Sequence, residues 1–167
     1  MLKKIVLLAL LLVPMGAIAQ QQIAYFTYSE VIMAMPETAA MQDSLMKTQA
    51  AIEAELQVLE EEYSKKYTSF MEDFNTLVDA IKTRRQQEIQ DIQERAVTFQ
   101  QQSQQQLQQL QQQLLMPIQQ KIQDALNAVA TEQNYLYVLE IGSGSILYTS
   151  PSAPDATPLV MRKLGLQ

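Results

Sequence analysis

The side chains that could carry out covalent chemistry are few in this chain of 167 residues. It contains no His and no Cys, which removes the commonest general base, the commonest nucleophile and the soft metal ligands. Glu60-Glu61-Glu62 is a dense run of carboxylates, but consecutive helical positions diverge by about 100°, which favours a solvated face over a metal site. Asp155 with Thr157 fits a local cap. We expect no enzyme, no cofactor and no metal, and a hydrolase built on carboxylates alone is the remaining enzymatic alternative.

The other chemistry in the sequence is the hydrogen bonding of glutamine amides. The segment from Phe99 to Gln119 reads FQQQSQQQLQQLQQQLLMPIQ. Such a tract can be disordered, prion-like or helical, but Leu107, Leu110 and Leu114 fall on one helical face, and Gln is a good helix former. The segment is therefore predicted to be helical. Its amides would offer donors and acceptors to unpaired polypeptide backbone, with no net charge to select among ligands.

The helices that carry these side chains are expected to be long, because the residues that form turns are almost absent from the middle of the chain. No Gly occurs from Ala17 to Ile141, and Pro117 is the only proline between Pro36 and Pro151. A compact α/β domain needs turns more often than that. The distribution predicts a mostly helical α+β protein with its irregular structure at the two ends.

Apolar residues follow a heptad pattern in two successive segments. Steps of three and four residues favour a coiled-coil seam, with one stutter near Tyr63–Tyr67. The first seam comprises Ile52, Leu56, Leu59, Tyr63, Tyr67, Phe70, Phe74, Leu77 and Ile81. The second comprises Ile89, Ile92, Ala96, Phe99, Ser103, Leu107, Leu110, Leu114, Ile118, Ile122, Ala125 and Val129.

Two seamed segments indicate an antiparallel helical hairpin over residues 36–133. Its midpoint places the reversal near residues 82–86, with arms of roughly 65–70 Å. Pro117 is expected to kink the second arm. The structural alternative is one unbroken helix from 38 to 133, which would need partner chains along its whole length.

The two ends of the chain are predicted to form one small β-rich body from residues 20–35 and 134–167. Strands are expected at 22–28, 135–141 and 145–149, with short helices after the N-caps Ser29 and Thr157. Such a body is a marginal core with bare sheet edges, so it is expected to oligomerise. The candidates for contacts between subunits are Ile23, Tyr25, Tyr135, Tyr137, Leu139 and Ile146.

Residues 1–19 have the pattern of a cleaved signal peptide. A basic start is followed by an apolar run from Ile5 to Val13, too short to span a bilayer comfortably, and by the A-x-A signal at 17–19. A retained anchor is the alternative. The formal charge of −6 becomes −8 when Lys3 and Lys4 are removed, which argues against nucleic-acid binding. We therefore expect an exported, acidic protein.

The chain resembles the Skp-type (OmpH-like) periplasmic chaperones over essentially its whole mature length. The resemblance is carried by QIAYFTYSEVIMAMPE, LLMPIQQKIQDALNAVATEQNYLYVLE and ILYTSPSAPDATPLVMRKLGL. It implies a homotrimer in the periplasm that holds unfolded outer-membrane proteins between helical tentacles without ATP. The best-known members are strongly basic, whereas this chain is acidic, which argues against contact with lipopolysaccharide or a membrane surface.

The grip on such clients would come from apolar residues beside the seams. The candidates for lining a client cavity are Val58, Met71, Val78, Val97, Leu115 and Met116. Alternatively, they widen the hairpin's own core. Lys82, Arg84 and Arg85 form a possible basic tip, with an ordinary solvated turn as the alternative. A structural coiled-coil protein of the envelope is the rival function, and the export signal argues against a third reading, a prefoldin-like cytosolic chaperone.

Overall fold

The computed structural model describes residues 22–166, and the predicted signal peptide lies outside this range. Its elements in chain order are β1 (Gln22–Phe26), α2 (Tyr28–Ala34), α3 (Pro36–Asp73), α4 (Asp79–Glu132), β2 (Tyr135–Glu140) and α5 (Thr157–Lys163). These residues form two compact units. We call residues 32–121 the hairpin unit, and residues 22–31 with 122–166 the strand unit.

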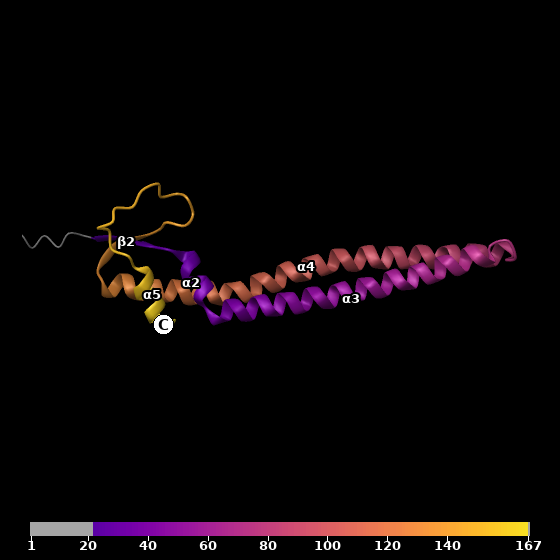
Figure 1. Cartoon of the computed structure of the whole chain (residues 1–167), viewed down its shortest axis with the longest axis horizontal. Helices are drawn as coiled ribbons and strands as arrows, with labels where there is room; N and C mark the ends of the chain where they lie inside the picture. Colours follow the sequence, from indigo (N-terminus) through magenta and orange to yellow (C-terminus); the bar gives the residue numbers. More distant parts are fainter. Residues whose placement is uncertain (1–21, 167) are drawn as a thin grey trace, which may run out of the picture. The chain divides into compact units, whose positions relative to one another are not determined.

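The hairpin unit is an antiparallel pair of long helices, α3 and α4 (Figure 1). Ion pairs between the helices give their register. Arg85 on α4 pairs with Asp73 on α3, and Lys121 on α4 pairs with Glu37 on α3. A later residue of α4 therefore faces an earlier residue of α3, as expected for antiparallel helices. The hairpin expected from the two seams is therefore present, and an unbroken helix from 38 to 133 is not.

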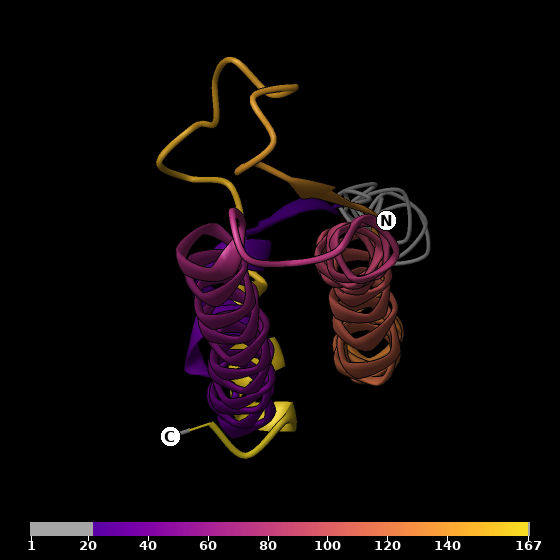
Figure 2. The same ribbon diagram turned by 90° about the vertical axis from the view of Figure 1, so that its right-hand side faces the viewer.

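The reversal lies at residues 74–78, between the end of α3 and the start of α4 (Figure 2). The expected position near 82–86 was wrong, since those residues lie inside α4. The midpoint estimate assumed equal arms, but α3 has 38 residues and α4 has 54. The last part of α4, from Ile122 onward, belongs to the strand unit. Thr76 closes the turn by donating from its N–H and its hydroxyl to the Asp73 carbonyl, both at 2.8 Å.

The heptad seams form the core of the hairpin unit. The buried apolar residues of this unit within the two helices are Leu59, Phe70, Ile89, Ile92 and Ile118, all of them seam positions. Tyr67 and Phe74 are the exceptions, because both are exposed despite their place in the predicted seam. The stutter explains Tyr67, since two successive steps of four rotate the row away from the partner helix. Phe74 already belongs to the reversal. Pro117 lies inside α4 without ending it.

The strand unit is built on a two-stranded parallel sheet, β1 beside β2. Parallel strands need a long crossover connection, and here the whole helical hairpin supplies it. The register pairs Ile23 with Tyr137 and Tyr25 with Leu139. The segment 145–149 is irregular, so the third strand expected there is absent. Asp155 bridges to Tyr25 instead, so residues 154–156 flank β1.

Local signals end α4 and begin the short helices of the strand unit. Asn134 adopts a left-handed φ of 55°, which Asn tolerates better than most residues, and it turns the chain from α4 into β2. The Asp155 carboxylate accepts from the Thr157 N–H at 2.8 Å, which is the local cap expected from the sequence. Thr157 and Ser29 are themselves helical rather than N-caps.

The core of the strand unit gathers residues from both ends of the chain. Its buried side chains are Ala24, Phe26, Val31, Ile122, Ala125, Val129, Ala156, Thr157 and Val160. Thr157 Oγ1 accepts from the Thr27 N–H at 3.0 Å, which joins α5 to the end of β1. The ion pair of Lys163 with Glu132 links α5 to the last turn of α4 at 2.5 Å. Across residues 22–166, none of the helices has the length and apolar content that a membrane span requires.

Candidate functional site

The hairpin carries large apolar side chains on its surface. Val58, Met71, Val78, Val97 and Met116 are each more than half exposed, and Leu115 is half-buried. Within this single chain, five of the six residues expected to line a client cavity therefore do not widen the core of the hairpin. They are available for contact with another molecule.

These residues do not gather into one pocket. The register of the hairpin puts Met71 and Val78 next to the reversal, whereas Val58 and Val97 lie farther along, beyond the pair Glu62–Arg95. Leu115 and Met116 lie near the other end, close to the pair Glu37–Lys121. Apolar contacts are thus distributed along the helices at three levels.

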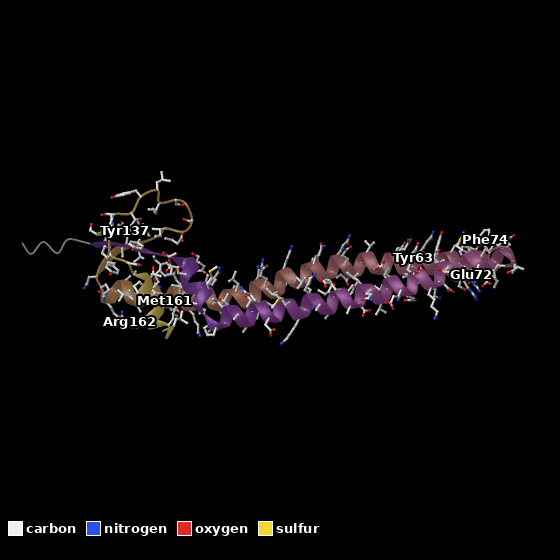
Figure 3. The ribbon with its side chains drawn as sticks, in the orientation of Figure 1. Tyr63, Glu72, Phe74, Tyr137, Met161 and Arg162 are labelled. Atoms are coloured by element: carbon white, nitrogen blue, oxygen red, sulfur yellow. The ribbon has the colours of Figure 1, made fainter. Side chains whose placement is uncertain are left out.

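Three further exposed residues on the hairpin were not among the expected candidates. Met46, Tyr67 and Phe74 are all more than a third exposed. Tyr63 stacks on Tyr67 with ring centroids 5.8 Å apart, and Phe70 meets Phe74 edge to face at 5.4 Å. Figure 3 shows Tyr63 and Phe74 in the part of the hairpin that leads to the reversal. Tyr67 and Phe74 were not selected because they were assigned to the buried seam. The stutter was the one feature of the sequence that indicated exposure of Tyr67.

Between these levels α4 has no charge at all over a long stretch. From Ala96 to Gln120 no acidic or basic residue occurs, which corresponds to roughly 35–40 Å of helix. The glutamines of this stretch are exposed, and Ser103 and Ile118 are buried. We call residues 96–120 the uncharged stretch. Its surface consists of amides with isolated apolar side chains such as Val97 and Met116.

Charged residues instead join the two helices on either side of this stretch. Lys66 Nζ lies 2.7 Å from Glu88 Oε2, and this hydrogen bond lowers the pKa of Glu88. The hydrogen bond from Lys121 lowers the pKa of Glu37 in the same way. Arg95 pairs with Glu62 at 3.0 Å. The ion pairs fix the register of the hairpin, while the uncharged stretch leaves its surface free of them.

The three basic residues near the reversal do not form a free positive patch. Arg85 binds Asp73 at 2.8 Å, and Arg84 lies 3.5 Å from Glu88. Lys82 lies 4.6 Å above the Phe74 ring and 3.9 Å from Asp79. Each cation thus has an acidic neighbour within 4 Å, and Arg84 shares Glu88 with Lys66.

The strand unit presents a second apolar surface on one face of its sheet. Ile23, Tyr137 and Leu139 are exposed there, and Tyr25 is half-buried. Ala24 and Phe26, whose side chains alternate with theirs, are buried on the opposite face. Partial desolvation, followed by the charge of Asp155, raises the pKa of Tyr25. Four of the six predicted subunit-contact residues, Ile23, Tyr25, Tyr137 and Leu139, thus share what we call the sheet face, with Tyr137 labelled in Figure 3.

The other two predicted contact residues are Tyr135 and Ile146. Tyr135 is half-buried and pairs with Gln22, before the shift in the register of the sheet. Ile146 is half-buried in the irregular segment between β2 and α5, where Leu147 and Tyr148 are 96 % and 78 % exposed. Neither residue was among the predicted contact residues, although both lie in the segment predicted as a strand at 145–149. They extend the exposed apolar surface of the strand unit.

The acidic run on α3 shows no sign of a metal site. Glu60 and Glu61 are exposed, and Glu62 is engaged by Arg95. Within residues 22–166, no three carboxylates come together in a way that could hold an ion.

Comparisons with known proteins agree with this architecture. The family model described as "Outer membrane protein (OmpH-like)" matches residues 22–164. Among solved structures, the chain is similar to a proposed outer membrane chaperone (OmpH-like) from Caulobacter crescentus CB15. That match has a TM-score of 0.74 and 14 % sequence identity, and it covers 86 % of this chain and 82 % of the other. No curated protein matches the chain.

Proposed function

Because the chain belongs to the OmpH-like family of outer membrane proteins, we propose that it is an ATP-independent holdase for unfolded outer-membrane proteins. The family is generally non-enzymatic, which is consistent with a role in binding rather than in catalysis. The clients would be held along the helical hairpins while they cross the periplasm.

The distribution of apolar side chains on the hairpin is the observation that carries this proposal. Met71, Val97 and Met116 are exposed at three levels of a surface that is mostly polar and charged. Each contact is weak, but several made at once give tight overall binding, because each new contact forms at high effective concentration. A client held in this way is released in steps. Exposed methionines adapt to clients of different sequence.

The sheet face supports a proposal about assembly. Exposure of an apolar patch to water is unfavourable for a unit with a small core, and a second copy of the chain would cover the patch. We propose a homotrimer joined through the strand unit, with Ile23, Tyr137 and Leu139 at the contact. Three hairpins would then enclose the client cavity. The mature protein would act in the periplasm after removal of residues 1–19.

Lipopolysaccharide or membrane-surface contact is not part of the proposal. The sequence is acidic overall, and Lys82, Arg84 and Arg85 are paired with acidic neighbours. These cations would hold the reversal in place rather than bind an anionic surface.

Aggregation of an unfolded β-barrel protein tests the function directly. A denatured outer-membrane protein is diluted into buffer with the mature chain at a stoichiometric ratio, without nucleotide, and light scattering is followed. The expected result is suppressed scattering and one complex whose mass equals three chains plus one client. Unchanged aggregation with an intact assembly would contradict the holdase and favour a structural envelope protein.

A further inference from the structure

A hollow lies between α3 and α4 beside Pro117, within the hairpin unit. α3 contributes Ala40 and Met41 to its wall, and α4 contributes Leu114, Pro117 and Ile118. Its volume is about 420 Å³, which is within the range of sites that take small ligands or single large side chains. We call it the Pro117 hollow.

The hollow combines an apolar wall with an unused backbone acceptor. Pro117 has no N–H, so the carbonyl of Gln113 lacks the donor that α-helical geometry would supply four residues later. Such a carbonyl lowers its free energy by accepting a hydrogen bond from another molecule. Met116, 68 % exposed, lies next to Pro117 in the sequence and adds a flexible apolar side chain.

The charges at the hollow are already neutralised. Glu37 and Lys121 are its only ionisable lining residues, and Lys121 donates to the Glu37 carboxylate. Along α4, the uncharged stretch runs from Ala96 up to the hollow. A ligand that approaches from this side meets amides, apolar side chains and the Gln113 carbonyl, which lacks its intrahelical donor.

We propose that the Pro117 hollow binds one large apolar side chain of an extended, uncharged polypeptide segment, whose neighbouring backbone N–H donates to the Gln113 carbonyl. The inference rests on the proposed holdase function and names an anchor point within it. An extended client chain presents unpaired N–H groups at regular intervals and alternating apolar side chains, which complement the acceptor and the wall. A lipid would bring an anionic or zwitterionic headgroup, to which the pair of Glu37 and Lys121 offers no net charge.

Fluorescence provides a direct test, because the protein contains no Trp. The probe is a short end-capped peptide that alternates Thr with Val and has one central Trp. Titration with the mature, assembled protein should shift the Trp emission to the blue and saturate. Ala40→Phe fills the hollow and should weaken this binding at least about fivefold, since roughly 1 kcal/mol or more of apolar burial is lost. Ala39→Phe is the matched control, because Ala39 is an exposed neighbour that does not line the hollow.

A second pair of changes tests the hydrogen bond. Pro117→Ala restores the helical donor to Gln113, and N-methylation of the amides beside the peptide's Trp removes the incoming donor. Each change alone should weaken binding about three- to tenfold, and the two together should cost little more than one. Pro117→Ala also favours the helix, so it keeps the test valid if Ala40→Phe does not fold.

The outcomes separate this inference from the holdase function. If the wild type, Ala40→Phe and Pro117→Ala bind the peptide with equal affinity and aggregation of the β-barrel client is still suppressed, the Pro117 hollow is not a binding site. The holdase function would then still stand. Loss of suppression by the wild type would overturn the function itself. Displacement of the Trp peptide by sodium laurate, at concentrations too low to unfold the protein and with higher affinity than the peptide, would assign the hollow to an acyl chain and overturn the inference.

Discussion

The hairpin unit and the strand unit expose apolar side chains in different ways. On the hairpin, Met71, Val97 and Met116 are separated by polar surface along two long helices. On the strand unit, Ile23, Tyr137 and Leu139 share one face of a two-stranded sheet. A concentrated patch suits a fixed contact that recurs in every molecule, whereas dispersed contacts suit partners that vary. The difference separates the proposed assembly surface from the proposed client surface.

The two units also differ in how strongly a single substitution is expected to change the free energy of unfolding. Val160 on α5 is fully buried in the small core of the strand unit. Val160→Asp should therefore destabilise the protein by more than about 4 kcal/mol, because an unpaired charge would enter that core. Val97→Asp, the matched change on the exposed hairpin surface, should alter the stability by less than about 0.5 kcal/mol. Denaturant unfolding followed by circular dichroism measures both, and similar losses would erase the distinction.

Assembly and client binding should respond to different substitutions. Tyr137→Glu places a charge on the sheet face and should lower the association constant at least about tenfold, because the residue is 59 % exposed in the single chain and would be buried between copies. Val97→Ser removes one dispersed contact and should reduce the affinity for client less than about threefold. Sedimentation equilibrium and client titration measure the two effects. A trimer that tolerates Tyr137→Glu would refute the sheet face as the contact.

The smallest expected effect concerns the ion pairs of the hairpin. The hydrogen bond from Lys66 keeps the pKa of Glu88 below 4.5, and the stabilisation is present above that value and is lost as the pH falls through the lower pKa of the folded state. The melting temperature of the wild type should therefore fall slightly between about pH 5 and pH 3. Glu88→Gln should show a weaker dependence over this range, and Glu53→Gln, which removes a carboxylate that no residue of α4 pairs with in this structure, serves as the control. Identical curves for wild type and Glu88→Gln would exclude the pair as a contributor.

The position of the reversal depends on tertiary structure, whereas the helices on either side of it do not. Both helices and their seams followed from the spacing of apolar residues, because burial along a helical pair repeats with the helix itself. The reversal did not, because its estimate depended on arms of equal length. How far α4 continues beyond its pairing with α3 is set by the strand unit, and no local signal near Arg85 reports it.

The sequence by itself determined the helical pair, most of its core rows, the two strands and part of the set of exposed apolar side chains. Periodicity and composition act locally, so they are readable from the order of residues. Only the tertiary structure decided that β1 and β2 run parallel, that residues 154–156 flank β1 while 145–149 form no strand, and that Lys82, Arg84 and Arg85 lie close to acidic side chains. These features depend on contacts between segments that are distant in sequence or on the rotamers of long side chains. Such contacts form only in the folded chain, so local sequence patterns do not specify them.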